Sequence, residues 1–133
     1  MMVEIPRNRR YSMDHFWLRP EGNTAVVGLS AHLEEEIGDV ILLDLPDVDD
    51  EVAMSSPCGI IESEGIVSEI ISPVSGTVAQ VNADLENSPE LVNEDPYGEG
   101  WLFRVLMDDS TEVESLMTPE EYRIYLTDLH GEE

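Results

Sequence analysis

The stretch "GIIESEGIVSEIISPVSG" (residues 59–76) contains two runs of isoleucine and valine on either side of Ser63, Glu64 and Gly65. β-Branched residues favour strands, and a glycine between two such runs is typical of a hairpin turn. Gly65 can adopt the positive φ that a tight turn requires. The stretch therefore predicts an antiparallel hairpin, and the residue at its tip has no side chain.

Most of the remaining chain is predicted to form short strands separated by turns. The predicted strands are rich in valine, leucine and aromatic residues and cover residues 24–30, 40–45, 77–81 and 101–107. Pro46 ends the second of these and begins an acidic loop, because proline cannot donate a hydrogen bond to a neighbouring strand. This succession predicts a mainly β fold, a small barrel or sandwich.

Two helices are predicted from their capping residues. The first covers residues 31–38, with Ser30 as N-cap and Gly38 at its end. The second begins in "TPEEYRIYL", where Thr118 is the N-cap, Pro119 takes the first helical position, and Glu121 completes a capping box. We therefore expect one short internal helix and a helical C-terminal tail.

The length of 133 residues, 41% of them hydrophobic, suits one domain with its own core. We expect an N-terminal arm over residues 1–10, a β core over residues 11–107 and a helical tail over residues 108–133. The sequence contains no internal repeat and no low-complexity linker that would divide it further.

The charge is strongly unbalanced, since 30 acidic residues face 6 basic ones and the formal net charge is -24. Every basic residue is an arginine, and the chain contains no lysine. Such a surface repels nucleic acid and anionic membranes, so neither is expected as a partner. Two explanations of the charge remain open: a solvated acidic coat, or adaptation to high salt.

The compartment is predicted from the single cysteine and the hydropathy pattern. Cys58 has no partner for an internal disulfide, which agrees with a reducing compartment, and we expect it to be a small buried hydrophobe. No apolar run is long enough to span a bilayer or to form the core of a signal peptide. We therefore expect a cytoplasmic protein.

Neither a metal site nor a catalytic site is expected. His15, His32 and His130 are scattered along the sequence, with no cysteine or histidine partners at ligand spacing. The acidic loop "DVDDE" (residues 47–51) lacks the glycine and ligand spacing of an EF-hand, so a solvated turn is favoured over a calcium site. No serine, cysteine or carboxylate pair lies in a recognisable catalytic setting.

Three segments carry a resemblance to a known family: "HLEEEIGDVILLDLPDV", "ESEGIVSEIISPVSGTVAQVN" and "NSPELVNEDPYGEGWLF". They resemble the H protein of the glycine cleavage system, a member of the lipoyl-carrier superfamily, and the similarity runs from Arg10 to about Leu126. The segment "ELVNEDPYGEGW" is the specific part, because related lipoyl and biotinyl domains share the hairpin but lack this segment. The resemblance implies a barrel-sandwich hybrid of two small sheets, a lipoyl-domain-like fold.

The resemblance also assigns a role to the hairpin tip. In the family, a lysine there is linked by an amide to lipoic acid, and the arm carries an aminomethyl group between the decarboxylating, tetrahydrofolate-dependent and dihydrolipoyl dehydrogenase components. Gly65 occupies the position of this lysine, and Glu64 precedes it. Because the chain contains no lysine, we expect no covalently bound lipoate. Gly65 is also a favourable turn residue in its own right.

Further departures concern the cleft that receives the loaded arm in the family. Phe16 replaces the glutamate of the family's His-Glu-Trp, and that carboxylate would pair with a cationic amine. Glu69 stands where the family has aspartate on the other side of the cleft, and Asp14 where a small polar residue or aspartate is common. Two interpretations of Phe16 remain open. Its ring cannot pair with a cationic amine, as expected if no arm is received; alternatively, the ring simply packs beside Trp17.

Two functions from different classes remain open. The first is a non-catalytic protein of the glycine cleavage H family that binds glycine decarboxylase, aminomethyltransferase or lipoate-handling proteins with its own arm site empty. The second is a structural or regulatory interaction module that keeps the lipoyl-domain fold and serves another assembly. The segment "NEDPYGEGW" favours the first function, although a packing role would also explain its presence.

Overall fold

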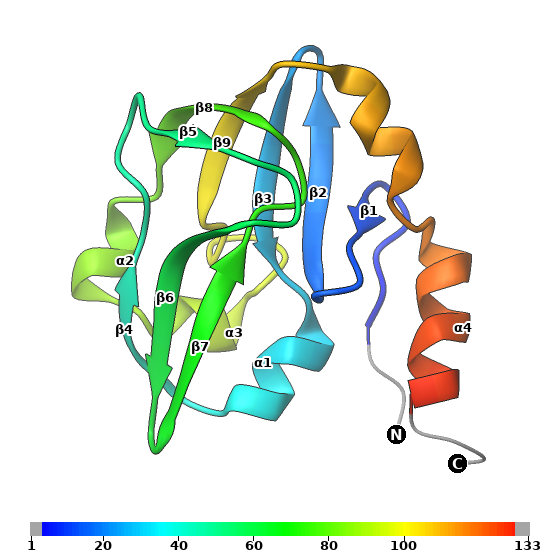
Figure 1. The fold of residues 1–133 in the computed structure, drawn as a ribbon. Coiled ribbons are helices and arrows are strands. Elements are labelled where there is room, and N and C mark those ends of the chain that lie inside the picture. The colour runs from blue at the N-terminus through cyan, green and yellow to red at the C-terminus, as the bar shows by residue number, and fades with distance from the viewer. Residues whose placement is uncertain (1–3, 130–133) are drawn as a thin grey trace.

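Two antiparallel β-sheets form the body of the structure, a computed structural model that describes residues 4–129 (Figure 1). The larger sheet has the strand order β1-β2-β3-β9-β8-β5, and the smaller one has the order β4-β6-β7. The strands of the larger sheet are β1 (Arg10–Tyr11), β2 (Phe16–Glu21), β3 (Thr24–Leu29), β9 (Phe103–Met107), β8 (Gly76–Val81) and β5 (Glu51–Val52). Those of the smaller sheet are β4 (Val40–Asp44), β6 (Pro57–Ser63) and β7 (Ile66–Ile71).

Short helices connect and flank the strands. They are α1 (Ala31–Ile37), α2 (Asp84–Asn87), α3 (Leu91–Glu94), a 3-10 helix (Ser110–Ser115) and the longer α4 (Pro119–Leu129). The predicted fold class, mainly β with a C-terminal helix, is confirmed. The expectation of only one short internal helix is wrong, because α2 and α3 add two single-turn helices between β8 and β9.

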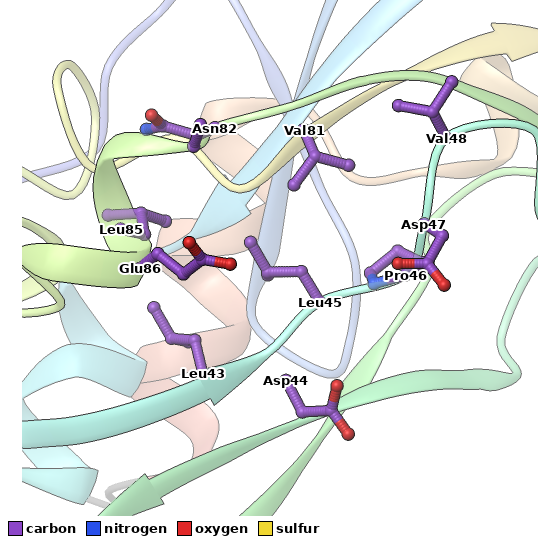
Figure 2. A pocket seen from close by; sticks show the side chains of 11 residues that line it. Leu43, Asp44, Leu45, Pro46, Asp47, Val48, Val81, Asn82, Leu85 and Glu86 are labelled. Carbon is purple, nitrogen blue, oxygen red and sulfur yellow. The ribbon is translucent and has the colours of Figure 1, made fainter.

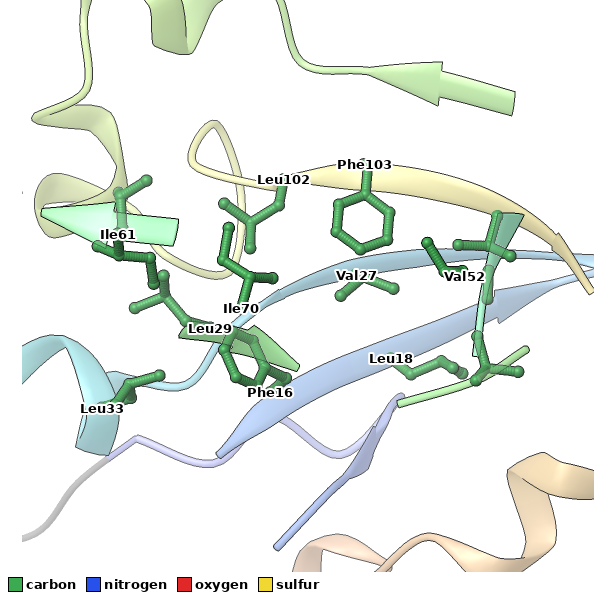
Figure 3. Close-up of a cluster of buried hydrophobic side chains, with 14 of the residues drawn as sticks. Phe16, Leu18, Val27, Leu29, Leu33, Val52, Ile61, Ile70, Leu102 and Phe103 are labelled. Carbon is green, nitrogen blue, oxygen red and sulfur yellow. The ribbon is translucent and has the colours of Figure 1, made fainter. Parts of the chain in front are cut away.

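The main hydrophobic core lies between the two sheets (Figure 3). Leu18, Val27 and Phe103 contribute from the larger sheet, and Ile61 and Ile70 contribute from the smaller one. All five side chains are fully buried. Burial of this shared apolar surface holds the smaller sheet, and with it the predicted hairpin, against the larger sheet.

A second cluster of buried side chains covers the opposite face of the larger sheet. Its members are Tyr11, Trp17, Val26, Tyr97, Tyr122 and Leu126, the last two of which belong to α4. Trp17 packs directly over Gly28, where a Cβ atom would clash with the indole ring. Glycine is therefore needed at position 28 for this packing. The helix α4, which contributes Tyr122 and Leu126 to the cluster, lies along the edge of the larger sheet beside β1 (Figure 1).

The predicted helix caps are confirmed. The Ser30 hydroxyl accepts a hydrogen bond from the Leu33 amide at 3.3 Å, and Gly38 ends α1 with a φ of +77°. The Thr118 amide donates to the Glu121 carboxylate at 2.9 Å, and the Glu121 amide donates to the Thr118 hydroxyl at 3.2 Å. These reciprocal bonds make the predicted capping box at the start of α4.

Strand β2 is absent from the strands predicted above, yet it pairs along its whole length with β3. Its sequence, "FWLRPE", contains Pro20, and a proline inside a run argues against a strand. Here Pro20 is exposed and lies near the end of β2, next to the turn into β3. The predicted strand over residues 101–107 begins only at Phe103.

Parts of the predicted N-terminal arm and C-terminal tail, residues 1–3 and 130–133, lie outside the described residues, and His130 is among them. Between these limits β1 begins at Arg10, β9 ends at Met107, and the 3-10 helix and α4 follow. No helix within residues 4–129 combines the length and the apolar character that a membrane span needs.

Candidate functional site

The predicted hairpin is formed by β6 and β7, and Glu64 and Gly65 make the two-residue turn at its tip. Ser63 pairs with Ile66 at the end of the ladder. Gly65 has a φ of +83°, whereas Glu64 is outside the positive region, which is the arrangement of a type II turn. A Cβ atom at Gly65 would meet nothing within 4 Å. Glycine is thus favoured by the backbone conformation and not by a lack of space.

The outward face of the smaller sheet, which adjoins this tip, mixes apolar and acidic side chains. One cross-strand row holds Leu42, Glu62 and Val67, and the next holds Asp44, Ile60 and Glu69. All six side chains are exposed. Within residues 4–129 none of the three carboxylates takes part in an ion pair. The face therefore carries uncompensated negative charge next to exposed hydrophobic groups.

The five predicted site residues occupy different surroundings. Gly65 and Glu64 form the exposed tip, and Glu69 lies on the outward face of β7. Asp14 is exposed in the turn before β2. Phe16 is only 1% exposed and belongs to the main core between the sheets. Of the five, only Gly65 and Glu64 are neighbours in the structure, in the turn of the hairpin.

Phe16 is a core residue, but it does not pack beside Trp17. Neighbouring residues of a strand point to opposite faces. Phe16 accordingly enters the main core, where Figure 3 shows it between Leu33 and Ile70. Trp17 belongs to the cluster on the other face of the same sheet. The aromatic ring at position 16 therefore fills an interior position that is shielded from solvent.

Ser63, next to the tip, is a residue that sequence reasoning did not single out. It is 6% exposed and pairs with Ile66 on one side and Val40 on the other. Its hydroxyl is buried and has no hydrogen-bond partner among the described residues. An unsatisfied buried hydroxyl lowers stability modestly. The alternation of β6, which turns every second residue inward, is the signal that would have shown its burial.

The segment "NEDPYGEGW" has a clear packing role. The indole of Trp17 donates a hydrogen bond to the Pro96 carbonyl at 2.9 Å, and the Ala31 amide donates to the Tyr97 hydroxyl at 3.0 Å. Arg9 lies over the rings of Trp17 and Tyr97, 4.4 and 5.4 Å from their centroids. The segment thus links the N-terminal residues, β2 and the start of α1.

Asn93 of the same region fixes the connection between α1 and β4. Its side-chain oxygen accepts a hydrogen bond from the Val40 amide at 2.8 Å. Its amide group donates to the Gly38 carbonyl at 2.8 Å and to the Glu34 carboxylate at 3.1 Å. Since Val40 also pairs with Ser63, Asn93 supports the end of the smaller sheet that carries the tip.

Two of the histidines that are scattered in the sequence come together in the structure. The rings of His15 and His32 are 4.5 Å apart, and His15 Nδ1 lies 2.9 Å from the Tyr122 hydroxyl. That hydroxyl also bonds with Ser30 at 2.8 Å. The distance between these two residues along the sequence therefore does not reflect their distance in space. No group of three or more metal-ligating side chains occurs within residues 4–129.

Cys58 lies on β6, the strand that leads to the tip, and is partly buried. Burial raises the pKa of its thiol to about 11. The thiol is therefore protonated at neutral pH and is a poor nucleophile.

Comparison with known proteins identifies the family. A family model described as "Glycine cleavage H-protein" matches residues 9–129. The chain is also 50% identical over 121 residues to the glycine cleavage system H protein of Rubrobacter xylanophilus, which covers 91% of this chain and 94% of that protein. The chain belongs to the glycine cleavage H-protein family.

Other members of the H-protein family agree in sequence and fold. The probable glycine cleavage system H protein of Haloarcula marismortui is 43% identical over 123 residues, or 92% of this chain and 97% of that one. The crystal structure of a glycine cleavage system H protein from Mycobacterium marinum superposes with a TM-score of 0.84 at 34% identity, covering 92% of this chain and 98% of that one. H proteins are lipoate carriers and not enzymes, in agreement with the expectation of a non-enzymatic protein.

Proposed function

We propose that this H-family protein has no lipoyl arm of its own and acts by binding components of the glycine cleavage system. The observation that carries the proposal is the glycine at the tip of the hairpin, in a chain that contains no lysine. An amide to lipoate requires a primary amine on a side chain, and Gly65 supplies none. The residues present therefore do not fit a covalently attached lipoyl group.

The conformation of the tip supports this proposal. Gly65 takes a positive φ, which L-residues other than glycine adopt at a cost of roughly 1–2 kcal/mol. The turn is thus adapted to glycine, and a lysine at this position would introduce strain.

The surroundings of Phe16 provide further support. Its ring is buried among apolar side chains, so no carboxylate at this position is available to a cationic amine. Glu69 and Asp14 are exposed to water, where a charged pair contributes little. A protein that handles no aminomethyl group needs neither an amine at the tip nor a carboxylate at position 16, so the absence of both is expected.

The partners that we propose are glycine decarboxylase, aminomethyltransferase and lipoate-handling proteins. The outward face of the smaller sheet, with the rows around Glu62 and Ile60, remains available beside the tip. Exposed apolar groups among uncompensated carboxylates suit a partner surface that presents apolar and basic groups.

The test uses glycine decarboxylase and aminomethyltransferase from Rubrobacter xylanophilus, the source of the relative that is 50% identical. Calorimetric titration should show saturable binding of at least one of them. The protein should also inhibit glycine-bicarbonate exchange by the lipoylated H protein of that organism. The double variant Glu62→Gln/Glu69→Gln should bind more weakly, whereas Glu35→Gln/Glu114→Gln, which makes the same change in charge elsewhere, should bind as the parent does.

A second function, an interaction module that serves another assembly, is favoured by one observation. The segment "NEDPYGEGW" is held by Trp17, Ala31 and Arg9, so packing alone explains its presence. If neither enzyme binds and exchange is not inhibited, the first proposal is contradicted and this second function is favoured.

A further inference from the structure

A pocket of about 330 Å³ lies where the two sheets adjoin, between the end of β4 and the helix α2 (Figure 2). Its lining is partly apolar and partly polar. The apolar part comes from Leu43 of β4, Leu45 directly after β4, Val81 at the end of β8 and Leu85 of α2. This volume is at the lower end of the range for ligand pockets and suits one side chain or a small group.

Three carboxylates surround the apolar walls. Asp44 and Asp47 line the β4 side of the pocket, and Glu86 lines the α2 side. Asp44 also belongs to the outward face of the smaller sheet, in the row with Ile60 and Glu69. Figure 2 shows Glu86 reaching from α2 towards Leu45. All three side chains are exposed, and within residues 4–129 none of them takes part in an ion pair.

The protein itself offers no cation for this pocket among the arginines whose contacts are described. Arg9 lies over Trp17, and Arg19 and Arg104 both bind Glu21. Arg10 and Arg123 likewise bind partners elsewhere, namely the Leu116 carbonyl and Glu120. The chain contains no lysine. A complementary cation must therefore come from another molecule.

We propose that this pocket receives an arginine side chain, flanked by apolar residues, from an extended segment of a partner protein. An arginine presents an aliphatic stem that packs on apolar walls and a guanidinium that remains near solvent, where it meets the carboxylates. Its planar donors match carboxylates in pairs, and the guanidinium is less strongly hydrated than an ammonium group. Charge complementarity therefore selects arginine over a neutral apolar side chain.

The pocket is separate from the arm site. Strand β4 runs from Val40, which pairs with Ser63 beside the tip, to Asp44, which pairs with Ile60 further down the hairpin. The pocket lies at the Asp44 end of β4, away from the hairpin tip. Occupation of the pocket therefore does not depend on whether Gly65 can carry an arm. Asp44 belongs both to the pocket and to the outward face, but the peptide titration contains no glycine cleavage enzyme, so it tests the pocket separately from the proposed function.

The test is a titration of the full-length ¹⁵N-labelled protein with the peptide acetyl-Leu-Arg-Leu-amide, followed by amide chemical shifts. The matched probe has citrulline, a neutral isostere, in place of arginine. We expect saturable shifts centred on Leu45, Val81 and Leu85, and binding of the citrulline peptide that is about fivefold weaker, the factor that about 1 kcal/mol implies.

The variants test the carboxylates directly. Asp44→Asn/Asp47→Asn/Glu86→Gln should weaken binding of the arginine peptide about fivefold, on the scale of a few exposed charge pairs. Glu35→Gln/Asp39→Asn/Glu114→Gln makes the same change in net charge on exposed residues outside the pocket and should leave binding within about twofold of the parent.

Several results would overturn the proposal. Shifts that spread over all acidic surfaces, or equal weakening by the two triple variants, would indicate only non-specific attraction of a cation. Equal binding of the citrulline peptide would indicate an apolar occupant. Equal binding of acetyl-arginine-amide, without the leucines, would indicate a site for small cations and not for a protein segment.

Discussion

At the scale of single residues, the proposal that this chain carries no arm depends on Gly65 and Phe16. Gly65 is set by backbone conformation, because its φ of +83° falls in the left-handed region. Phe16 is set by packing, because its ring is buried between the two sheets. The two positions therefore respond to substitution in different ways.

Replacement of Gly65 by alanine should lower the free energy of unfolding by about 1 kcal/mol, since alanine adopts a positive φ with strain. Urea denaturation measures this loss. Gly65→Asn is the control, because asparagine tolerates the left-handed region better, and it should cost less than alanine does. Equal stability of the alanine variant and the parent would mean that the turn changes its conformation freely.

Replacement of Phe16 by alanine should lower the free energy of unfolding by about 3–5 kcal/mol, the usual cost of removing a buried phenylalanine. Phe16→Glu should cost still more, because it also places a carboxylate among apolar side chains. Thermal and urea unfolding measure both changes. Leu106→Ala, at a side chain that is 46% exposed, is the control and should cost much less. A stable Phe16→Glu protein would show that position 16 is open to solvent.

At the scale of elements, the sequence predicts those turns and helix caps that depend on residues close together in the chain. The hairpin around Gly65, the Ser30 cap and the Thr118 capping box all follow from residues within a few positions of one another. Strand β2 forms although Pro20 disfavours a strand, because β2 pairs with β3 along its whole length and its first three residues are buried. The contact of His15 with His32 could not be predicted, since it depends on how β2 and α1 meet in space.

Glu21 connects two strands of the larger sheet and gives the fold a small dependence on pH. Its carboxylate bonds with Arg104 of β9 and with Arg19 of β2, and these bonds hold its pKa below the ordinary value of 4.5. A lowered pKa in the folded state means that the stabilisation is present above 4.5 and is lost as the pH falls through the folded value.

Glu21→Gln should therefore lower the free energy of unfolding by about 0.5 kcal/mol at pH 7, because the pair is exposed and screened. The difference from the parent should vanish in acid, below the lowered pKa. Urea denaturation across this pH range measures it. Glu114→Gln is the control and should be neutral at every pH. A deficit that persisted unchanged in acid would show that packing, and not the charge of Glu21, is responsible.

At the scale of the whole molecule, the formal net charge of -24 on 133 residues is the dominant property. Within residues 4–129 the arginine ion pairs involve Glu21 and Glu120, so most carboxylates repel one another without compensation. Such self-repulsion disfavours the compact state, and salt screens it over a Debye length of about 10 Å at 0.1 M.

The midpoint of thermal unfolding should therefore rise as KCl is increased from dilute buffer to molar concentration. The same titration near pH 4, where carboxylates begin to be protonated, is the control and should show a smaller rise. A midpoint that did not respond to KCl at neutral pH would contradict the role of repulsion. It would also remove the support for adaptation to high salt.

The central claim, that this H-family protein carries no lipoyl arm, is tested most directly by intact-mass spectrometry after incubation with lipoate ligase, ATP and lipoate. The Gly65→Lys variant serves as the positive control, because the side chain meets no neighbouring atoms at the exposed tip even though the positive φ strains the turn. We predict that the parent protein keeps its unmodified mass while the variant gains a lipoyl group. A lipoyl group on an internal residue of the parent protein would contradict the claim.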